Sequence, residues 1–538
     1  MLTAARAAII VGHIMRLLKL LLLASAAGML AVSAAQAADL PTKKAPPAAA
    51  APNCYASFYS WLDSTPADCP LSAYGVTVYG TLDMGGGYET HASRFNDYYS
   101  NGVSELVAKT SNNGKWQGVP NGLSQSNVGI KIKEAIVPNW YVIGDVNFGF
   151  DPYSMEFANG PRSLVDNNGR SSIFQSANGD SSRAGSIDNT RAYVGLQNNT
   201  FGTLTFGRQY AFSNDMASNY DPFGGAYAFS LIGSSSTPVG GLGDTELARY
   251  NTSVKYQVQY QAVRAGALVQ VGNYSERNSA KDAYQFDLGG DYAGFSVDGI
   301  YSHADDAVFL SSLSATALNN VAATKPPAAL VTADDLGATI ANVDSWAIAG
   351  KYKTGPFQAF AGWAYDRFSN PTDSYAKNAQ ANGFTAIDDI YVPGGNVCTS
   401  TTTGCSASGG YGPNISLTTY TIHKNLQTAW VGTKYAILTN LDAAVGYYHE
   451  WQNDYDTSPA TNCVANKTAP YTGGTPQGTK KGDCAGHEDV VSGMLDWRPV
   501  KRVDVYGGVM YSKVEGGMAS GFAHTDNTAY TAGVRISF

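Results

Sequence analysis

Apolar and polar residues alternate along most of this chain, in segments of about ten residues separated by polar stretches. Alternation with a period of two is typical of a β-strand that has one apolar face and one polar face. A strand that crosses a membrane needs about 9–11 residues. The pattern predicts sixteen such strands, near residues 75–89, 126–137, 140–150, 188–197, 202–210, 247–261, 263–273, 283–293, 295–304, 344–354, 357–367, 424–437, 441–451, 488–497, 503–513 and 528–538.

The connections between these segments alternate in length. Short links follow one strand of each pair, as at 137–139, 198–200, 293–294 and 355–356. Long polar links follow the other strand, near 90–125, 151–187, 211–246, 274–282, 305–343, 368–423, 452–487 and 514–527. Short turns at one end and long loops at the other are typical of outer-membrane barrels. We therefore expect an all-β fold, a 16-stranded antiparallel transmembrane β-barrel with short periplasmic turns and long extracellular loops.

The start of the chain has the features of a cleaved export signal. Arg16 and Lys19 precede an apolar run at 20–23, and an A-x-A site follows at 35–37. We assign residues 1–37 to the signal, with Met15 as an alternative start and an uncleaved anchor as the alternative reading. Residues 38–73 are expected to form a periplasmic linker, rich in Ala and Pro as far as residue 52, and an N-terminal segment. The barrel is expected from 74 to 538.

Composition and charge agree with a membrane barrel. Charged residues make up 14% of the chain, whereas an ordinary soluble domain has about 25%. The 34 Tyr and 58 Gly also fit, because only every second barrel residue must be apolar and aromatic rings gather at the two membrane interfaces. The net charge is −8, and loss of the signal would remove Arg6, Arg16 and Lys19. A chain with this net negative charge is not expected to bind nucleic acid. Its charge is compatible with a pore that favours cations.

The six cysteines form three local pairs, which are Cys54 with Cys69, Cys398 with Cys405, and Cys463 with Cys484. In an exported chain such pairs indicate disulfides that close surface loops. A metal site is the alternative, but the chain has no C-x-x-C motif and only His487 lies near any of these cysteines. We therefore expect disulfides and no metal or other cofactor.

One loop is long for the connection it makes. Segment 211–246 joins two predicted strands, is rich in Gly and Ser, and carries Asp215 and Asp221. Loops longer than about 15 residues are uncommon and are usually functional or disordered. A barrel of sixteen strands is too wide to be filled by its own side chains, so sorting of ions requires a narrow point lined by charged groups. We expect this loop to fold inward and to place its acids opposite basic groups on the wall.

The strands beside this loop resemble those of a known family. N-T-R-A-Y-V-G-L at 189–196 and F-G-T-L-T-F-G-R-Q-Y at 201–210 are similar to the fourth and fifth strands of the Gram-negative trimeric general porins. D-P-F-G-G-A-Y at 221–227 resembles the tip of their inward-folded third loop. The first strand, from Tyr74, is also similar, and the opening around Cys54 and Cys69 is closest to the rhizobial (alphaproteobacterial) branch. The resemblance is strong over 74–273 and at the C-terminus, and between 274 and 500 it is a matter of pattern.

The resemblance implies a function and a set of pore residues. It implies passive diffusion of ions and small hydrophilic solutes through a homotrimer that contacts outer-membrane lipid and lipopolysaccharide. In the family, wall arginines oppose carboxylates on the third loop. The wall positions fall on Arg191 and Arg249, and the loop acids on Asp221 and Asp215. A third wall arginine is absent, since Asn127 stands in its place, and we therefore expect a weak cation preference.

Two further predictions concern the barrel surface and the chain end. Arg208 has outward parity with Phe206, so we expect it at the subunit interface. The last strand alternates up to an aromatic terminal residue, which resembles the C-terminal signature recognised by the bacterial barrel-assembly machinery. We assign Tyr530, Gly533 and Phe538 to this assembly signal.

Other classes of function have weaker support. The chain has no G-x-S-x-G, H-E-x-x-H or phosphate-binding loop motif, and its seven His are scattered, so we expect no enzyme. A surface adhesin or binding barrel would use the long loops at 368–423 and 452–487. A substrate-specific sugar channel would need a track of aromatic residues along the lumen. Tyr193 and Tyr448 have inward parity, but two residues do not make a track. Eighteen strands in place of sixteen would favour that channel.

Overall fold

A computed structural model describes most of the chain after residue 53. The described residues are 54–92, 105–107, 114–153, 155, 191–233, 249–270, 282–305, 309–310, 337–339, 342–369, 384–387, 390–393, 422–454, 485–519 and 524–538. The predicted signal, the linker as far as residue 53, and Cys398, Cys405, Cys463 and Cys484 lie outside them.

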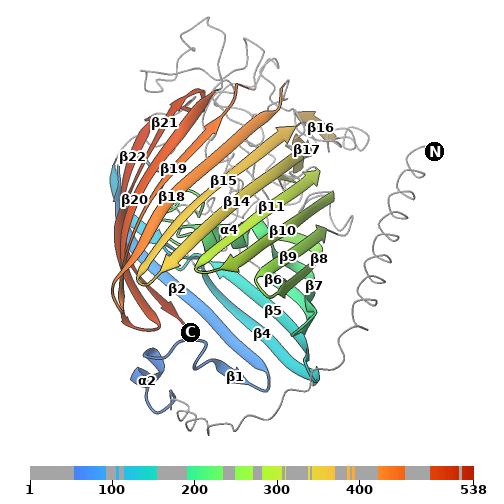
Figure 1. The fold of residues 1–538 in the computed structure, drawn as a ribbon. Coiled ribbons are helices and arrows are strands. Elements are labelled where there is room, and N and C mark those ends of the chain that lie inside the picture. The colour runs from blue at the N-terminus through green and yellow to red at the C-terminus, as the bar shows by residue number, and fades with distance from the viewer. Residues whose placement is uncertain are drawn as a thin grey trace, which may run out of the picture. The chain divides into compact units, whose positions relative to one another are not determined.

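The strands form one antiparallel sheet that closes on itself, because β2 (Val76–Glu89) pairs with β22 (Asp526–Ser537) (Figure 1). Between them the chain adds β3 (Lys115–Pro120), β4 (Ser126–Val137), β5 (Trp140–Phe150), β6 (Arg191–Asn198), β7 (Gly202–Tyr210), β8 (Arg249–Tyr260), β9 (Val263–Gln270), β10 (Asp282–Tyr292), β11 (Phe295–Asp305), β14 (Asn342–Thr354), β15 (Phe357–Ser369), β18 (Lys424–Leu438), β19 (Leu441–Gln452), β20 (Gly486–Val500) and β21 (Val503–Gly516). The predicted 16-stranded barrel is confirmed, and each predicted strand end lies within three residues of the observed one.

The remaining elements are short. They are helix α2 (Phe58–Leu62), strand β1 (Leu71–Ala73), helix α4 (Phe212–Tyr220) and the 3₁₀ turn η4 (Gly517–Ala519). A separate four-stranded sheet contains β12 (Phe309–Leu310), β13 (Gly337–Thr339), β16 (Phe384–Ile387) and β17 (Ile390–Pro393). Among the described residues, no helix is long and apolar enough to cross a membrane.

The two faces of the barrel differ as the alternation predicts. On β6, Val194 and Leu196 are exposed on the outer face, whereas Arg191 and Tyr193 point inward. The outer face of β10, β11, β14 and β15 carries an aromatic row near each end of these strands. One row contains Tyr284, Tyr301, Trp346 and Tyr365, whose neighbouring rings lie 5.4–6.2 Å apart. The other contains Tyr292, Phe295, Tyr352 and Phe357. Aromatic rows of this kind mark the two interfaces of a membrane barrel.

The second barrel strand is interrupted, which the sequence pattern did not predict. β3 and β4 both pair with β2, and residues 121–125 form a turn between them. The turn is held from inside, because the backbone N–H groups of Leu123 and Ser124 donate to the Asp83 carboxylate at 2.7 and 3.0 Å. Buried backbone N–H groups need such partners once a strand is broken.

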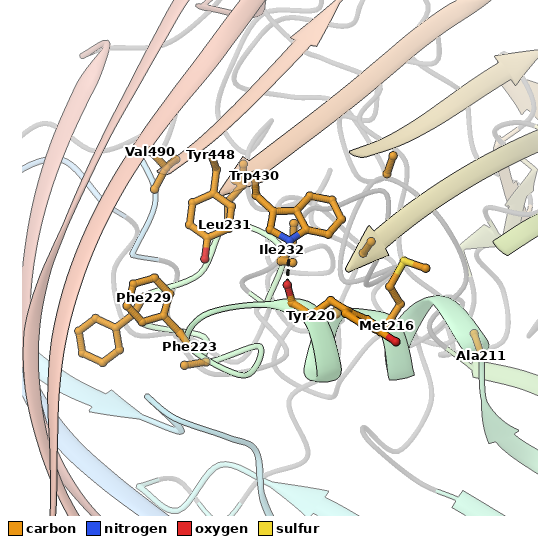
Figure 2. Packing of buried hydrophobic residues seen from close by; sticks show 14 of the residues in the cluster. Ala211, Met216, Tyr220, Phe223, Phe229, Leu231, Ile232, Trp430, Tyr448 and Val490 are labelled. Atoms are coloured by element: carbon orange, nitrogen blue, oxygen red, sulfur yellow. Dashed lines mark hydrogen bonds between the residues drawn. The ribbon is translucent and has the colours of Figure 1, made fainter. Parts of the chain in front are cut away.

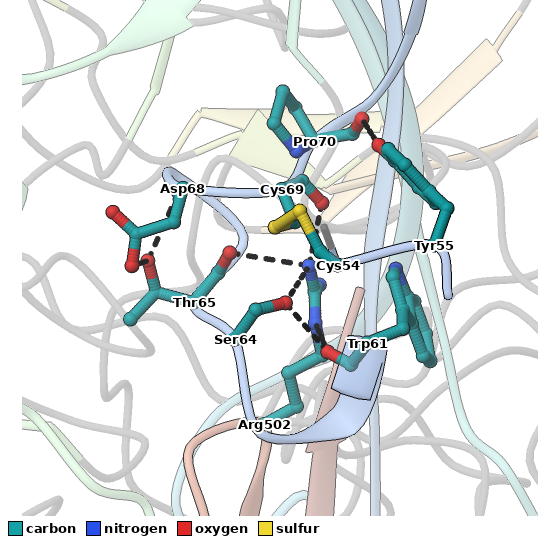
Figure 3. The surroundings of a disulfide bond; sticks show 9 residues. All are labelled: Cys54, Tyr55, Trp61, Ser64, Thr65, Asp68, Cys69, Pro70 and Arg502. Carbon is teal, nitrogen blue, oxygen red and sulfur yellow. Dashed lines mark hydrogen bonds between the residues drawn. A yellow bond between two sulfur atoms is a disulfide. The ribbon is translucent and has the colours of Figure 1, made fainter. Parts of the chain in front are cut away.

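The N-terminal segment is joined to the barrel. The predicted disulfide between Cys54 and Cys69 is present (Figure 3). After it, β1 pairs with the first residues of β2, with Leu71 opposite Val78 and Ala73 opposite Val76. The sequence pattern does not predict a strand in this N-terminal segment, because three residues are too few to show alternation.

Candidate functional site

The connection after β7 turns into the barrel interior. It forms α4, which lies against β10, β11, β14 and β15, and then an irregular stretch that is described as far as residue 233 (Figure 1). Figure 2 shows the apolar side chains of this stretch, including Phe223, Phe229 and Leu231, facing Trp430 on β18 and Tyr448 on β19. The inward-folded third loop is therefore confirmed, and we call residues 211–233 the constriction loop.

The first turn of α4 is held by polar side chains from the wall. Its cap residue, Ala211, has no side chain that can accept from the free N–H groups of the first turn. Gln285 on β10 replaces the cap, because its Oε1 accepts from the backbone N–H of Phe212 at 2.7 Å. Lys255 on β8 binds the Asp215 carboxylate at 2.9 Å and lies over the Phe212 ring. These contacts fix the start of the helix without any cap in its own sequence.

The last turn of α4 is held through Tyr220. Its hydroxyl donates to Asp298 on β11 at 2.7 Å and accepts from Arg264 on β9 at 2.9 Å. Its backbone carbonyl accepts from the indole N–H of Trp430 on β18 at 2.9 Å. Burial raises the pKa of the Tyr220 hydroxyl, so this group remains a neutral donor at physiological pH. The helix is thus attached to strands on both sides of the interior.

Asp221, the residue after the helix, is buried at 2% exposure. Its carboxylate accepts from the backbone N–H groups of Phe223 and Gly225 at 3.0 and 2.9 Å, and from the hydroxyl of Tyr448 on β19. Burial raises the pKa of Asp221 to about 6, and the hydrogen bonds from Tyr448 and Gly225 act in the opposite direction. The sequence predicted this acid opposite basic groups on the wall, whereas in the structure it lies in the contact between loop and wall, with Tyr448 and two backbone N–H groups as its donors.

Glycines on the wall make room for the tip of the loop. A Cβ atom at Gly446 on β19 would lie 2.7 Å from the Phe223 ring and 3.1 Å from Pro222. One at Gly432 on β18 would lie 2.6 Å from Pro222, and one at Gly508 on β21 would lie 2.8 Å from Phe229. Such distances are too short for any larger residue without movement. We call β18, β19 and β21 the contact wall.

The opposite wall presents basic groups stacked on aromatic rings. Arg191 lies 3.3 Å from Asp145 on β5, and its guanidinium donates to the hydroxyl of Tyr79 on β2 at 2.8 Å. Arg191 and Arg249 both lie over the ring of Tyr210, at 4.6 and 4.9 Å. Cation–π contacts of this kind stabilise a charge that has lost part of its water. We call β2 and β4–β8 the charged wall.

The predicted pore residues thus occupy different environments. Asp215 keeps 40% of its side chain exposed, whereas its partner Lys255 is 7% exposed. Arg191 is partly exposed, and Arg249 is buried at 2%. Arg191 and Arg249 meet at Tyr210. Asp215 and Asp221 do not meet, because they lie at opposite ends of α4.

Other predicted residues also have a place in the barrel. Arg208 lies opposite Ala192 on the same outward face as Phe206 and is half-buried. Asn127, at the position of the absent arginine, points inward and accepts from the amide of Asn147 at 3.0 Å.

Sequence reasoning missed the residues that anchor the loop. Tyr79 and Gln285 have no signal in the sequence beyond their inward parity, and Tyr210 has the same parity as the outward Phe206, from which a register shift in the pairing of β7 with β8 separates it. Tyr448 had been recognised as an inward aromatic, but its partner Asp221 lies 227 residues away in the chain. The three glycines of the contact wall have no local signal at all.

The proposed assembly residues lie on or just after β22, the strand that closes the barrel by pairing with β2. Tyr530 is exposed on the outer face. Gly533 lies directly beneath the Tyr506 hydroxyl, where any Cβ would clash. The backbone of Phe538 exchanges two hydrogen bonds with Gly80, at 2.9 and 3.0 Å.

Comparisons with known proteins agree with this architecture. A family model described as Gram-negative porin matches residues 24–537. An outer membrane porin protein of Bordetella pertussis is 32% identical over 111 residues, which are 20% of this chain and 26% of that relative. The sequence match therefore spans about a quarter of the curated relative.

Solved structures with a similar outline include two porins. The anion-selective porin from Comamonas acidovorans is 12% identical, with a TM-score of 0.48, over 86% of this chain and 99% of that one. Salmonella typhi OmpF in complex with daunomycin is 14% identical, with a TM-score of 0.42, over 86% and 97% of the two chains.

The family match extends over nearly the whole chain and includes both the constriction loop and the closing strand. It confirms the resemblance found at 189–196, 201–210 and 221–227. The chain therefore belongs to the Gram-negative porin family, whose members are non-enzymatic channels of the bacterial outer membrane.

Proposed function

We propose that this protein is a general diffusion channel that passes ions and small hydrophilic solutes and has a weak preference for cations. The observation that carries the proposal is the constriction loop, which is anchored at both ends of α4 and at Asp221 inside a closed sixteen-stranded barrel. Such a barrel is wide enough for water, and an inward loop narrows it without filling it. Tyr448 is bound to Asp221, so it is not free to contribute to a sugar-binding track.

The weak cation preference is supported by how the charges are exposed. Arg191 is close to Asp145, and Arg249 is buried, so both present a reduced positive charge to water. Asp215 keeps 40% of its side chain exposed, while its partner Lys255 is almost covered. Exposed charges at a constriction act on passing ions more than covered ones do.

A homotrimer is supported by the outer face of the barrel. β10, β11, β14 and β15 carry two aromatic rows suited to the two lipid interfaces, whereas the exposed outward residues of β4 and β6 are aliphatic apart from Glu134. These are Val128, Ile130, Ile132, Ile136, Val194 and Leu196. A mainly aliphatic surface of this kind, with Phe148 on β5 and Phe206 on β7 beside it, fits a contact with other subunits. Arg208, on the neighbouring strand, would lie at the edge of this contact.

The remaining proposed partners follow from the seam and the outer face. The barrel-assembly machinery would recognise Tyr530, Gly533 and Phe538 on the strand that closes the barrel. Lipid and lipopolysaccharide would cover the aromatic face of β10–β15.

The test is conductance of the purified protein in a planar bilayer under a salt gradient. We expect current steps in groups of three and a small cation-favouring reversal potential. A clear chloride preference would contradict the proposed selectivity. Single steps that saturate with salt and are blocked by one sugar would favour a specific channel, and a folded barrel without steps would contradict a diffusion channel.

A further inference from the structure

The disulfide-closed N-terminal segment carries an exposed aromatic surface that the channel function does not use. Residues 54–62, C-Y-A-S-F-Y-S-W-L, contain no charged residue. Tyr55, Phe58 and Tyr59 are 63%, 73% and 67% exposed, and α2 has no buried residue. Three aromatic rings exposed to water within five residues of chain are unfavourable, because each forfeits the free energy of burying its apolar area.

This segment is fixed to the barrel and does not hang free. Arg502, in the turn between β20 and β21, is 1% exposed and reaches into the disulfide loop (Figure 3). Its guanidinium donates to the carbonyls of Trp61, Thr65 and Cys69 at 2.8, 3.1 and 2.6 Å. The same group lies 4.3 Å from the Trp61 ring centre. Four contacts from one side chain hold the loop at the short-turn end of the barrel.

The segment also continues the barrel wall. β22 ends at Ser537, and the next residue, Phe538, exchanges backbone hydrogen bonds with Gly80. β1 takes the next place on the same edge of β2. Leu71 on β1 is exposed and lies opposite Val78, an exposed residue of the outer face. Tyr55 is joined to this strand, because its hydroxyl donates to the carbonyl of Pro70. The aromatic segment is therefore continuous with the outer apolar surface of the barrel.

We propose that residues 54–62 form an interfacial anchor that lies in the headgroup region of the periplasmic lipid leaflet. The outer face of a barrel in the outer membrane is covered by lipid, and the segment extends that face at the periplasmic end. Tyr and Trp have an apolar ring with a polar tip, and such side chains concentrate where hydrocarbon meets water. The absence of charge from 54 to 62 removes the main cost of entering that layer.

The two charged residues of the disulfide loop itself, Asp63 and Asp68, are outside this surface. Asp63 follows the helix as its C-cap. Asp68 is exposed and accepts from the hydroxyl of Thr65 at 2.7 Å within the disulfide loop. The segment thus has an aromatic part that suits lipid and an acidic part that suits water, and Arg502 fixes the two parts relative to the barrel.

The test uses tryptophan fluorescence in vesicles of phosphatidylcholine brominated on its acyl chains near the headgroup. Phe58→Trp adds an indole to the proposed anchor. Phe295→Trp, in the aromatic row at the same end of the barrel, is the positive reference. Asp68→Trp, on the acidic part of the same segment, is the negative reference. The signal is the added emission of each variant over the parent protein, compared in brominated and ordinary lipid.

We expect bromine to quench the added emission of Phe58→Trp to the same extent as that of Phe295→Trp, and several-fold more than that of Asp68→Trp. Added emission that is unquenched and at the wavelength of hydrated indole would place the segment in the aqueous periplasm and overturn the proposal. Emission that is blue-shifted but insensitive to bromine would also overturn it, in favour of contact with a second copy of the chain. Tyr59→Trp repeats the measurement if Phe58→Trp does not give a heat-modifiable folded barrel.

Discussion

The two sides of the barrel interior hold the constriction loop by different means. On the contact wall, Gly432, Gly446 and Gly508 leave space that Pro222, Phe223 and Phe229 occupy. On the charged wall, Lys255 binds Asp215, and Arg191 and Arg249 stack on Tyr210 just before the loop begins. One side fixes the loop by shape, and the other places charged side chains beside it, which we propose are the charges that passing ions meet.

This difference separates two properties of the channel. Close packing is short-ranged and fails when a single carbon atom is added. Charge interactions in a water-filled space are weak and change gradually. Substitutions on the contact wall should therefore alter the size of the opening, and substitutions on the charged wall should alter its ion preference. The following predictions test that separation, from the largest expected effect to the smallest.

The largest effect is expected for Gly446→Val. Its side chain would overlap Phe223 and Pro222, and overpacking of this kind costs about 1–3 kcal/mol. We expect the loop tip to leave the wall, with a larger single-channel conductance and little change in reversal potential. The matched control is Gly493→Val, since a Cβ at that position has no neighbour closer than 3.9 Å. Equal conductance in the two variants would show that the wall glycines do not position the loop.

A smaller effect is expected when the Asp221 contact is removed. Asp221→Ala leaves the Tyr448 hydroxyl and two backbone N–H groups without their acceptor, at a cost of about 1–3 kcal/mol. We expect noisier single-channel currents and a lower thermal transition of the folded barrel. Tyr448→Phe, which removes one bond and leaves the two backbone bonds, should have a weaker effect in the same direction. Because Asp221 is buried, Asp221→Asn should leave the reversal potential unchanged, and a shift would show that its charge reaches the permeating ions.

The same contact should depend on pH. The pKa of Asp221 is raised to about 6 by burial, so the buried form binds a proton more tightly than the free form. The stabilisation that the protonated Asp221 gives to loop packing is therefore complete below the ordinary Asp pKa of about 4. It is lost as the pH rises through about 6, where the buried carboxyl loses its proton. We expect open-channel noise to fall between pH 7.5 and pH 5. The Asp221→Asn variant serves as the control, and an identical pH response in that variant would assign the change to other groups.

The smallest effect is expected on the charged wall. Arg191→Gln removes one partly exposed charge, and an interaction of up to about 1 kcal/mol in water corresponds to at most about a fivefold change in the cation-to-anion permeability ratio. We expect a shift of the reversal potential towards stronger cation preference. Arg208→Gln, on the outward face, is the control and should not shift it. A change in conductance as large as that of Gly446→Val would remove the distinction between the two walls.

The sequence by itself determined the barrel. Strand positions, the alternation of long and short connections, and the inward parity of Arg191 all follow from a pattern with a period of two, because each strand must present one face to lipid and one to water. The length of the third loop and its D-P-F-G-G tip were enough to identify the segment that enters the interior. These features are local, so they can be read from neighbouring residues.

Only the tertiary structure decided how that loop is held. Asp221 was expected to lie opposite basic groups on the wall, but its environment is set by Tyr448, which is distant in the chain. Nothing near Gly446 in the sequence shows that Phe223 will lie against it. The same holds for Arg502, whose role depends on carbonyls of the disulfide loop more than 400 residues earlier. Alternation fixes which face a side chain is on, whereas its partner on that face depends on which strands the closed sheet brings together.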